Sequence, residues 1–450
     1  MTSNLLAASD APSAMRVLPH FLCLGWARRW VWLGIVWLVC GTAATGLRAD
    51  PTATRSWTAT SGHRLEAKAL QLKDGQVQME KPDGAKIMVP LAKLSAEDQQ
   101  FLRQHFQADD APAVPAGKTP AAPAGQAADD LPHPLGETTN EIPCGGGFDY
   151  FLHLPKSLQK GAKHPVLFVM NPGGGGKDTV TRYLPGAERN RWIIAVSKQS
   201  RNDFDASQAA VDAMIKHACD SLPIDRKRIY VSGFSGGSRM AWATSQKRKD
   251  IAGVIACGAG GGIGSSKQTV YGLCGSNCFN RTDMANSFKP LKGKDHVLRY
   301  FVGQHDWADA ELCDDAITHL NGVFLLANRA KYPAEGAFYQ QQVGALVAEC
   351  QPGSPLRATM WAAFLTDRGA ADAAVTASYA ALTKDPINKL YLKGLSDVNK
   401  FAQKTFGEIA ASQWQADPKI AAACKRESSK YAGTPWEEVL TKMADDAEKF

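Results

Sequence analysis

The chain has 450 residues, enough for roughly two or three domains, and its 44% hydrophobic and 21% charged residues are ordinary for a globular protein. The formal net charge of +7 is not gathered into a dense basic patch with interleaved aromatic residues, so the sequence gives no support for nucleic-acid binding. No cluster of His, Cys or Asp has the spacing of metal ligands, and we expect neither a metal nor a cofactor.

The first 49 residues have the pattern of a signal peptide. Several arginines precede an apolar run over residues 30–46, and Ala49 ends a plausible cleavage site. The apolar run is short for a stable membrane span, so contact with a membrane is expected only through an uncleaved signal segment. The pattern predicts export to the periplasm or the extracellular space, with translation starting at either Met1 or Met15.

Residues 50–108 predict a small β-rich unit. Asp-Gly pairs at Asp74 and Asp83 separate short alternating segments, which is typical of a β-meander, and Ser95 is a candidate N-cap for a short helix. The segments RSWTATSGH, LKDGQVQMEKPDG and VPLAKLSAEDQQFL resemble the Sla homology domain of the SH3-like barrel class. The resemblance implies a small barrel that either binds a peptide or cell-envelope partner or serves as a spacer.

The remainder of the chain divides by composition. Residues 109–135 are rich in Ala and Pro and predict a semi-rigid linker. Within residues 136–332, helix-like stretches alternate with short apolar runs, which are FDYFLHL, PVLFVM, RWIIAV, RIYVSG, AGVIAC, QTVYGL and VLRYFV. This alternation favours an α/β domain, a mostly parallel sheet with helices on both faces in the α/β-hydrolase manner. Residues 333–450 predict a helical C-terminal extension of unknown role.

The segment RIYVSGFSGGSR, residues 228–239, carries the strongest functional signal. It places G-x-S-x-G, from Gly233 to Gly237, between a strand-like run and a helical stretch, which is the setting of a nucleophile elbow. We therefore expect Ser235 to be a nucleophile. The alternative is a tight turn without chemistry.

A serine nucleophile needs backbone donors for the oxyanion of the reaction intermediate. The residue after the nucleophile, Gly236, is one candidate. The glycine-rich loop that follows the PVLFVM run supplies Gly173 and Gly174 as others. A phosphate cradle is the rival interpretation, and it is disfavoured because Lys177 is followed by Asp178 rather than by Ser or Thr.

The general base is expected C-terminal to the serine, because the triad order in this fold is serine, acid, histidine. Three histidines satisfy this condition. His296 precedes the last strand, and His319 lies in an apolar-faced helical stretch. His305 directly follows the strand VLRYFV, where ligands are met at the carboxyl edge of an open sheet, and is the preferred base.

These motifs together resemble the polyhydroxybutyrate-depolymerase and feruloyl-esterase branch of the α/β-hydrolases, including secreted esterases of the LpqC type. The matching residues are Pro172-Gly173-Gly174, the strand with Ser235, the phrase AGVIACGAG, and Gly303, His305 and Trp307 near the end of the domain. The resemblance covers residues 148–329 and implies carboxylic-ester chemistry.

The acid is where the sequence departs from this family. In the phrase VYGLCGSNCFN, residues 270–280, Cys278 stands where the family has aspartate. We expect Asp283 to reach His305 in its place. The alternatives are Asp306, whose side chain should point away, and a neutral orienting role for Asn277 or Asn280.

Two further groups are candidates for substrate contact. Arg201 and Asn202 follow the strand RWIIAVS at the functional edge of the sheet, where they either line the pocket or cap the next helix. Trp307 beside the base either stacks on an aromatic or sugar ring or packs in the core.

Eight of the ten cysteines follow the signal segment, and this even number predicts disulfides in an oxidising compartment. Cys274 or Cys313 could hold Cys278, and Cys144 could anchor a turn. Cys219 and Cys257 lie in apolar helix and strand patterns, where buried free thiols are the alternative.

The sequence as a whole predicts an exported serine hydrolase that cleaves an ester or acylated polymer through a Ser235–His305 acyl-enzyme. The alternative is a binding or adaptor protein on a hydrolase scaffold impaired at Cys278. A thiol–disulfide enzyme is disfavoured, because Cys274 and Cys278 are spaced C-x-x-x-C with no thioredoxin pattern around them.

Overall fold

The computed structural model describes residues 54–58, 64–73, 76–90, 94, 102, 131–407 and 417–449. The chain divides into two compact units, Met1–Ala122 and Pro123–Phe450. The predicted signal peptide, the helix after Ser95 and almost all of the predicted linker lie outside the described residues.

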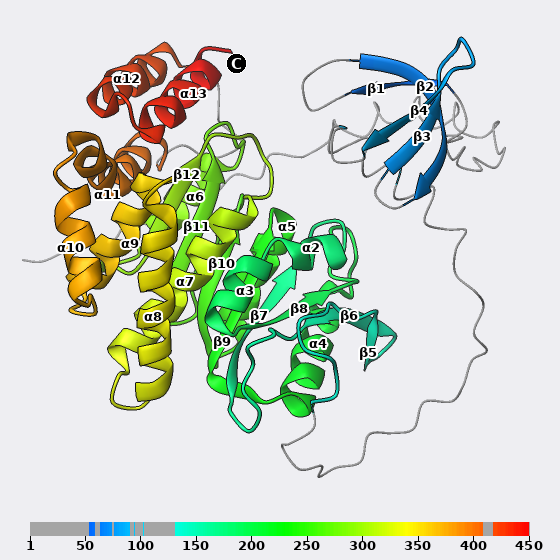
Figure 1. Cartoon of the computed structure of the whole chain (residues 1–450), viewed down its shortest axis with the longest axis horizontal. Helices are drawn as coiled ribbons and strands as arrows, with labels where there is room; N and C mark the ends of the chain where they lie inside the picture. The colour runs from blue at the N-terminus through cyan, green and yellow to red at the C-terminus, as the bar shows by residue number, and fades with distance from the viewer. Residues whose placement is uncertain are drawn as a thin grey trace, which may run out of the picture. The chain divides into compact units, whose positions relative to one another are not determined.

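The N-terminal unit contains a four-stranded antiparallel sheet in the order β1-β2-β3-β4 (Figure 1). The strands are β1 (Arg55–Thr58), β2 (Arg64–Lys73), β3 (Gln76–Glu80) and β4 (Lys86–Pro90). Alternate residues of β2 and β3 are buried, as the two-residue period of a strand requires, and pack around Trp57, whose indole N–H donates to the Ala67 carbonyl at 2.8 Å. The predicted β-meander is therefore confirmed as a sheet.

The second unit is built on an eight-stranded sheet in the order β12-β11-β10-β9-β7-β8-β6-β5. Strands β12 to β8 in this order are parallel, and β6 and β5 are antiparallel additions at one edge. The strands are β5 (Ile142–Gly145), β6 (Phe148–His153), β7 (His164–Met170), β8 (Ile193–Ser197), β9 (Ile224–Phe234), β10 (Ile251–Cys257), β11 (Thr269–Gly275) and β12 (Val297–Phe301). All seven strands expected from the sequence occur, and β5 is an addition to them.

Helices cover both faces of this sheet (Figure 1). One face carries α2, α3 and α7, and the other carries α4, α5 and α6. Their bounds are α2 (Lys177–Thr181), α3 (Leu184–Asn190), α4 (Ser207–Ser221), α5 (Gly236–Lys247), α6 (Arg281–Phe288) and α7 (Ala310–Ala327). The central strands β7 and β8 are buried along their whole length because they have helices on both sides. This is the α/β-hydrolase fold.

The C-terminal residues are helical as predicted, and they are joined to the hydrolase core. The elements are α8 (Pro333–Cys350), α9 (Pro355–Asp367), α10 (Ala373–Leu382), α11 (Pro386–Phe406), α12 (Pro418–Ser428), the 3-10 helix η3 (Ser429–Tyr431) and α13 (Pro435–Lys449). Buried side chains of α11 and α13 belong to the same core as α5 and α6. Figure 1 shows these last helices beside β12 and α6. In the part of the chain that the structure describes, no helix has both the length and the apolar character needed to cross a membrane.

Candidate active site

The G-x-S-x-G segment forms a sharp turn between β9 and α5. Ser235 has φ 51° and ψ −118°, one of three non-glycine residues with positive φ among those described. Its amide donates to the Cys257 carbonyl at 2.9 Å, and its carbonyl accepts from the amide of Arg239 at 3.1 Å. A strained backbone held by the surrounding structure is typical of a nucleophile elbow.

Glycine is required at both ends of this turn because two backbones meet there. A Cβ on Gly233 would lie 2.3 Å from the carbonyl oxygen of Gly237. A Cβ on Gly237 would lie 2.2 Å from the carbonyl oxygen of Met170, at the end of β7. The end of β7, the end of β9 and the start of α5 can therefore come together only without side chains, and this packing raises Ser235 at the carboxyl edge of the sheet.

The structure brings the predicted nucleophile and base together. The Ser235 hydroxyl lies 2.8 Å from His305 Nε2, although the two residues are 70 positions apart in the chain. His305 comes from the loop between β12 and α7, and both side chains are partly exposed. A serine hydroxyl hydrogen-bonded to an imidazole is the arrangement needed to activate the oxygen for attack.

The other two histidines are held elsewhere. His296 directly precedes β12, and its Nδ1 accepts from the backbone amide of Val270 on β11 at 3.3 Å. His319 is buried in α7 and donates from Nε2 to the Asp295 carbonyl at 2.8 Å, and burial lowers its pKa to about 4. His296 is therefore half-buried at the start of β12, and His319 is packed in α7, in the places that the sequence predicted for them.

The third position of the candidate triad is occupied by Cys278. Its sulfur lies 3.1 Å from His305 Nδ1, on the opposite side of the ring from Ser235, and the side chain is fully buried. In the motif VYGLCGSNCFN, Cys278 stands at the position of the aspartate in the family that the sequence resembles. That correspondence was the signal for its place beside the base, because residues that replace one another in a motif occupy the same place in the fold.

The structure corrects the prediction that Asp283 orients the base. The Asp283 carboxylate accepts from the Gly260 amide at 3.0 Å and from Arg239 at 3.2 Å, so it faces the start of α5 rather than the histidine. Asp283 lies in the first turn of α6, and from there its carboxylate reaches Gly260 and Arg239.

The remaining acid and amide candidates are also directed elsewhere. The Asn277 side chain accepts from the hydroxyl of Ser276 at 3.0 Å. The Asn280 amide donates to the Gly258 carbonyl at 2.8 Å. The Asp306 side chain is exposed, as expected.

Cys274, on β11, is a second buried thiol near Cys278. The Cys274 sulfur lies 3.6 Å from the Gly275 carbonyl, and the Cys278 sulfur lies 3.8 Å from the Gly258 carbonyl. The neighbouring Cys274 thiol, together with the hydrogen bond and charge of His305, lowers the pKa of Cys278 below the usual thiol range against the opposing effect of burial. Burial raises the pKa of Cys274 well above that range.

Aromatic rings surround the base. His305 lies between the rings of Phe234 and Phe279, with centroids 4.8 and 3.9 Å away. Phe279 is 63% exposed, which is unusual for phenylalanine. It was not among the predicted site residues, although it directly follows Cys278 in the sequence. Trp307 packs against Phe234 at 5.3 Å and against Tyr183 at 6.2 Å, so packing accounts for it more directly than substrate stacking.

The glycine-rich loop after β7 does not present the two predicted oxyanion donors, Gly173 and Gly174, as free amides. The Gly173 amide donates to the Asn171 side chain at 3.1 Å, and the Gly174 amide donates to the Asn171 carbonyl at 3.0 Å. These two donors are therefore engaged in a local turn, because Asn171 folds the loop back on itself. Gly236 is the first residue of α5, where the helix leaves amides without intrahelical acceptors, and it keeps the expected place for an oxyanion donor.

Arg201 and Asn202 lie beside this edge of the sheet. Arg201 forms an isolated β-bridge with Gly173, and the Asn202 amide donates to the Pro172 carbonyl at 2.8 Å. The Asn202 side chain lies against Gly236, since a Cβ on that glycine would be 1.8 Å from its oxygen. The Arg201 amide donates to the Ser207 hydroxyl at 3.0 Å, and that hydroxyl donates to the Arg201 carbonyl at 2.7 Å. Neither Arg201 nor Asn202 caps the next helix, whose N-cap is Ala206.

The predicted disulfides are not formed. All eight cysteines in the described part of the chain, from Cys144 to Cys424, are free thiols, and seven of them are buried. Cys144 bonds to the Phe148 carbonyl at 3.3 Å, and Cys257 and Cys313 lie in the core between α7 and the sheet. The even number of cysteines had predicted disulfides, but the buried thiols pack as small apolar side chains. Buried free thiols were the alternative stated for Cys219 and Cys257.

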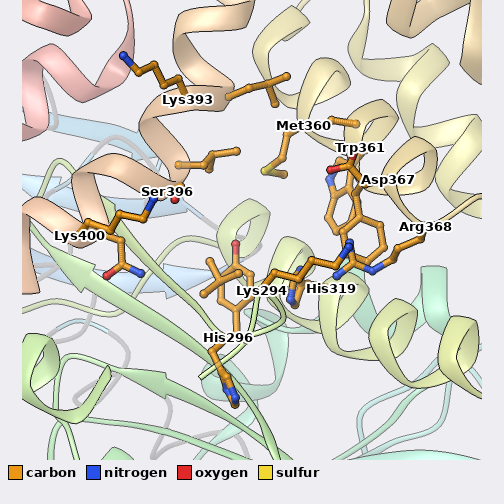
Figure 2. A pocket seen from close by; sticks show the side chains of 18 of the residues that line it. Lys294, His296, His319, Met360, Trp361, Asp367, Arg368, Lys393, Ser396 and Lys400 are labelled. Carbon is orange, nitrogen blue, oxygen red and sulfur yellow. The ribbon is translucent and has the colours of Figure 1, made fainter. Parts of the chain in front are cut away.

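A cavity of about 770 Å³ lies apart from this site, between the C-terminal helices and the β12 edge of the sheet (Figure 2). Its lining combines apolar side chains such as Met360 and Trp361 with Lys294, Arg368 and Lys400. It contains neither Ser235 nor His305. Over the described ranges of the chain, no group of three or more His, Cys, Asp or Glu side chains could hold a metal ion.

Comparison with known proteins identifies the N-terminal domain. Residues 47–109 match the SLA1 homology domain 1, SHD1. Over 58 residues, 13% of the chain, the sequence is 40% identical to the actin cytoskeleton-regulatory complex protein sla1 of Sclerotinia sclerotiorum, of which it spans 5%. The protein therefore carries an SHD1 domain at its N-terminus.

Solved structures similar to this chain include esterases. One crystal form of the Pyrobaculum calidifontis esterase is 18% identical with a TM-score of 0.24, covering 28% of this chain and 46% of that one. A second structure of an esterase from that archaeon is 11% identical with a TM-score of 0.35, covering 42% and 87%. Est1E from Butyrivibrio proteoclasticus is 14% identical with a TM-score of 0.33, covering 43% and 99%. Similarity at this level concerns the fold alone.

Proposed function

We propose that the protein is an exported serine hydrolase that cleaves carboxylic esters, with Ser235 as nucleophile and His305 as general base. The contact of 2.8 Å between Ser235 Oγ and His305 Nε2, at the crest of a strained strand-to-helix turn, is the observation that carries the proposal. The resemblance of residues 148–329 to polyhydroxybutyrate depolymerases and feruloyl esterases supports short polyesters, feruloyl-type esters or acylated polysaccharides as substrates.

The reaction follows from this geometry. His305 Nε2 accepts the Ser235 proton as Oγ attacks the ester carbonyl carbon, and the carbonyl oxygen becomes an oxyanion near the Gly236 amide. The ester C–O bond then breaks, and the alcohol leaves with the proton from Nε2. Water attacks the acyl-enzyme after giving a proton to Nε2, the acid is released, and that proton returns to Ser235.

The N-terminal domain and the signal pattern extend this proposal. The basic and apolar pattern of residues 1–49 supports export, and the SHD1 domain is a candidate for binding a peptide or cell-envelope component close to the substrate. The enzyme would then act on polymers outside the cytoplasm.

Labelling with a fluorophosphonate probe, together with hydrolysis of p-nitrophenyl acetate, tests the catalytic part. The purified protein should react with the probe and turn over the ester, and Ser235→Ala should abolish both. Ser396→Ala, which changes an exposed serine on α11, is the matched control and should behave as wild type. Absence of labelling in folded wild-type protein would instead favour a binding protein on a hydrolase scaffold.

A further inference from the structure

We propose that Cys278 acts as a thiolate positioning residue in place of the carboxylate of a serine hydrolase triad. This inference rests on the proposed function of Ser235 and His305. It assigns a chain of three side chains, in the order Cys278, His305 and Ser235, drawn from the β11–α6 loop, the β12–α7 loop and the β9–α5 turn.

The role of His305 as a base determines which of its ring nitrogens holds the proton. Ser235 can donate to Nε2 at 2.8 Å only if Nε2 has no proton, so the single proton of the neutral ring must lie on Nδ1. The group that faces Nδ1 is the sulfur of Cys278, at 3.1 Å. The sulfur must therefore accept this hydrogen bond, and a thiolate is a much stronger acceptor than a thiol.

A neutral thiol would be a poor substitute. If it donated its proton to Nδ1, the ring proton would lie on Nε2, and the ring could not accept the serine proton. If it donated instead to the Gly258 carbonyl, 3.8 Å from the sulfur, it would accept from Nδ1 only weakly. A thiolate also carries the same charge as the family carboxylate, so it stabilises the imidazolium that forms during attack by Ser235. The tautomer and the charge thus both favour an ionised Cys278.

The surroundings of Cys278 explain how a buried thiolate is tolerated. The Cys274 thiol, the ring of His305 and the Asn280 backbone amide together lower the pKa of Cys278 against the opposing effect of burial, and the ring of His305 lies 3.1 Å from its sulfur. The other titratable or charged groups facing the Cys274–Cys278 pair are Cys257 from β10, Tyr300 from β12 and Arg281 from α6. Burial raises the pKa values of Cys257 and Tyr300, so both stay neutral, and the Arg281 guanidinium is paired with Asp446.

Burial also separates this thiolate from the nucleophile. Cys278 has no exposed surface, whereas Ser235 is partly exposed at the crest of its turn. The sulfur therefore cannot meet the ester carbonyl directly, and it acts on the reaction only through the ring of His305. This is a positioning role, and its signature is the protonation state of the His305–Cys278 pair.

Substitutions at Cys278 separate charge from packing. Cys278→Ser keeps the size and a hydrogen-bonding group but cannot ionise, and it should lower kcat for p-nitrophenyl acetate by roughly 10³- to 10⁴-fold, as should Cys278→Ala. Cys278→Asp restores an anion and should stay within about tenfold of wild type. Asp283→Asn and Cys424→Ser remove a nearby carboxylate and a distant buried thiol, and both should leave kcat unchanged. Wild-type kcat in Cys278→Ser would overturn the proposal.

The pH dependence of kcat/KM is a second test of the thiolate. Activity in wild type should persist to pH values well below the usual thiol pKa, because Cys278 stays ionised there. The Cys278→Asp variant, which carries an ordinary carboxylate at this position, is the matched control and should keep its activity over the same pH range. A wild-type acid limb in the usual thiol range that moves to lower pH in Cys278→Asp would contradict the thiolate.

A spectroscopic titration keeps this inference separate from the proposed function. In Ser235→Ala protein, the ultraviolet absorbance of one thiolate should be present at neutral pH, and it should disappear in the Ser235→Ala/Cys278→Ser double variant. If wild type hydrolyses no ester, the proposed enzyme function fails, but this absorbance still decides whether Cys278 is ionised. If ester hydrolysis depends on Ser235 and the absorbance is missing, the inference on Cys278 alone fails.

Discussion

Ser235 is held by residues a few positions away in the chain and by the ends of two neighbouring strands, β7 and β10, whereas His305 depends on side chains presented by separate loops. On the serine side, Gly233 and Gly237 let the turn pack against the carbonyl of Met170. On the histidine side, the β11–α6 loop presents Cys278 to the ring. The first arrangement is local and covalently constrained, and the second is assembled by tertiary contacts.

The C-terminal helices support only the second arrangement directly. Arg281, at the start of α6, is buried and donates to the Ser276 carbonyl in the loop that carries Cys278, at 3.2 Å. Its guanidinium pairs with Asp446 of α13 and lies 5.3 Å from the ring centroid of Phe406 on α11. The helical extension therefore contributes to the position of the base, which gives a structural role to a region whose sequence indicated none.

The largest expected effect comes from a change on the serine side. Gly237→Ala forces a Cβ to within 2.2 Å of the Met170 carbonyl oxygen, so the β9–α5 turn cannot close. We expect the free energy of unfolding to fall by about 3 kcal/mol or more, with loss of ester hydrolysis. Denaturant unfolding measures this. Gly336→Ala on α8, where a Cβ meets open space, should instead stabilise the fold by about 0.5–1 kcal/mol.

A smaller effect is expected on the histidine side. Asp446→Asn leaves the buried Arg281 without its carboxylate and should lower the free energy of unfolding by about 2–4 kcal/mol. The kcat should fall with it, because the loop carrying Cys278 loses support. Asp445→Asn removes the neighbouring carboxylate on the same helix and should change neither quantity. Equal behaviour of the two variants in unfolding and kinetics would argue against the supporting role of α13.

The smallest expected effect is on substrate contact. Phe279→Ala removes an exposed ring whose centroid lies 3.9 Å from that of His305, and it should raise KM for an aromatic acyl ester by about two- to tenfold with little change in kcat. Steady-state kinetics with an aromatic and a short aliphatic ester measure this, since the aliphatic ester should be nearly unaffected. If KM stays the same for both esters, the ring does not contact the acyl group.

Much of the fold followed from the sequence because its signals are periodic and local. Apolar β-branched runs predicted the seven strands from β6 to β12, and the α/β alternation predicted helices on both faces. The errors have one cause. Three predictions were wrong: those for the Gly173 and Gly174 amides, for the disulfides and for Asp283. Each depends on which side chains and backbone groups contact one another between different helices, strands and loops. Composition and spacing in the sequence do not contain this information.

Ser235 and His305 were determined by the sequence itself, because a strand-turn-helix with glycines at both ends constrains the backbone locally, and a parallel strand delivers its following loop to one edge of the sheet. The partner of His305 was decided only in three dimensions. A carboxylate a few residues along the chain was the reasonable expectation, yet the turn after β11 directs the Cys278 sulfur at the ring and sends Asp283 to Arg239 and Gly260. Hydrogen-bond geometry depends on direction as well as on proximity in sequence, and direction is set by the packed fold.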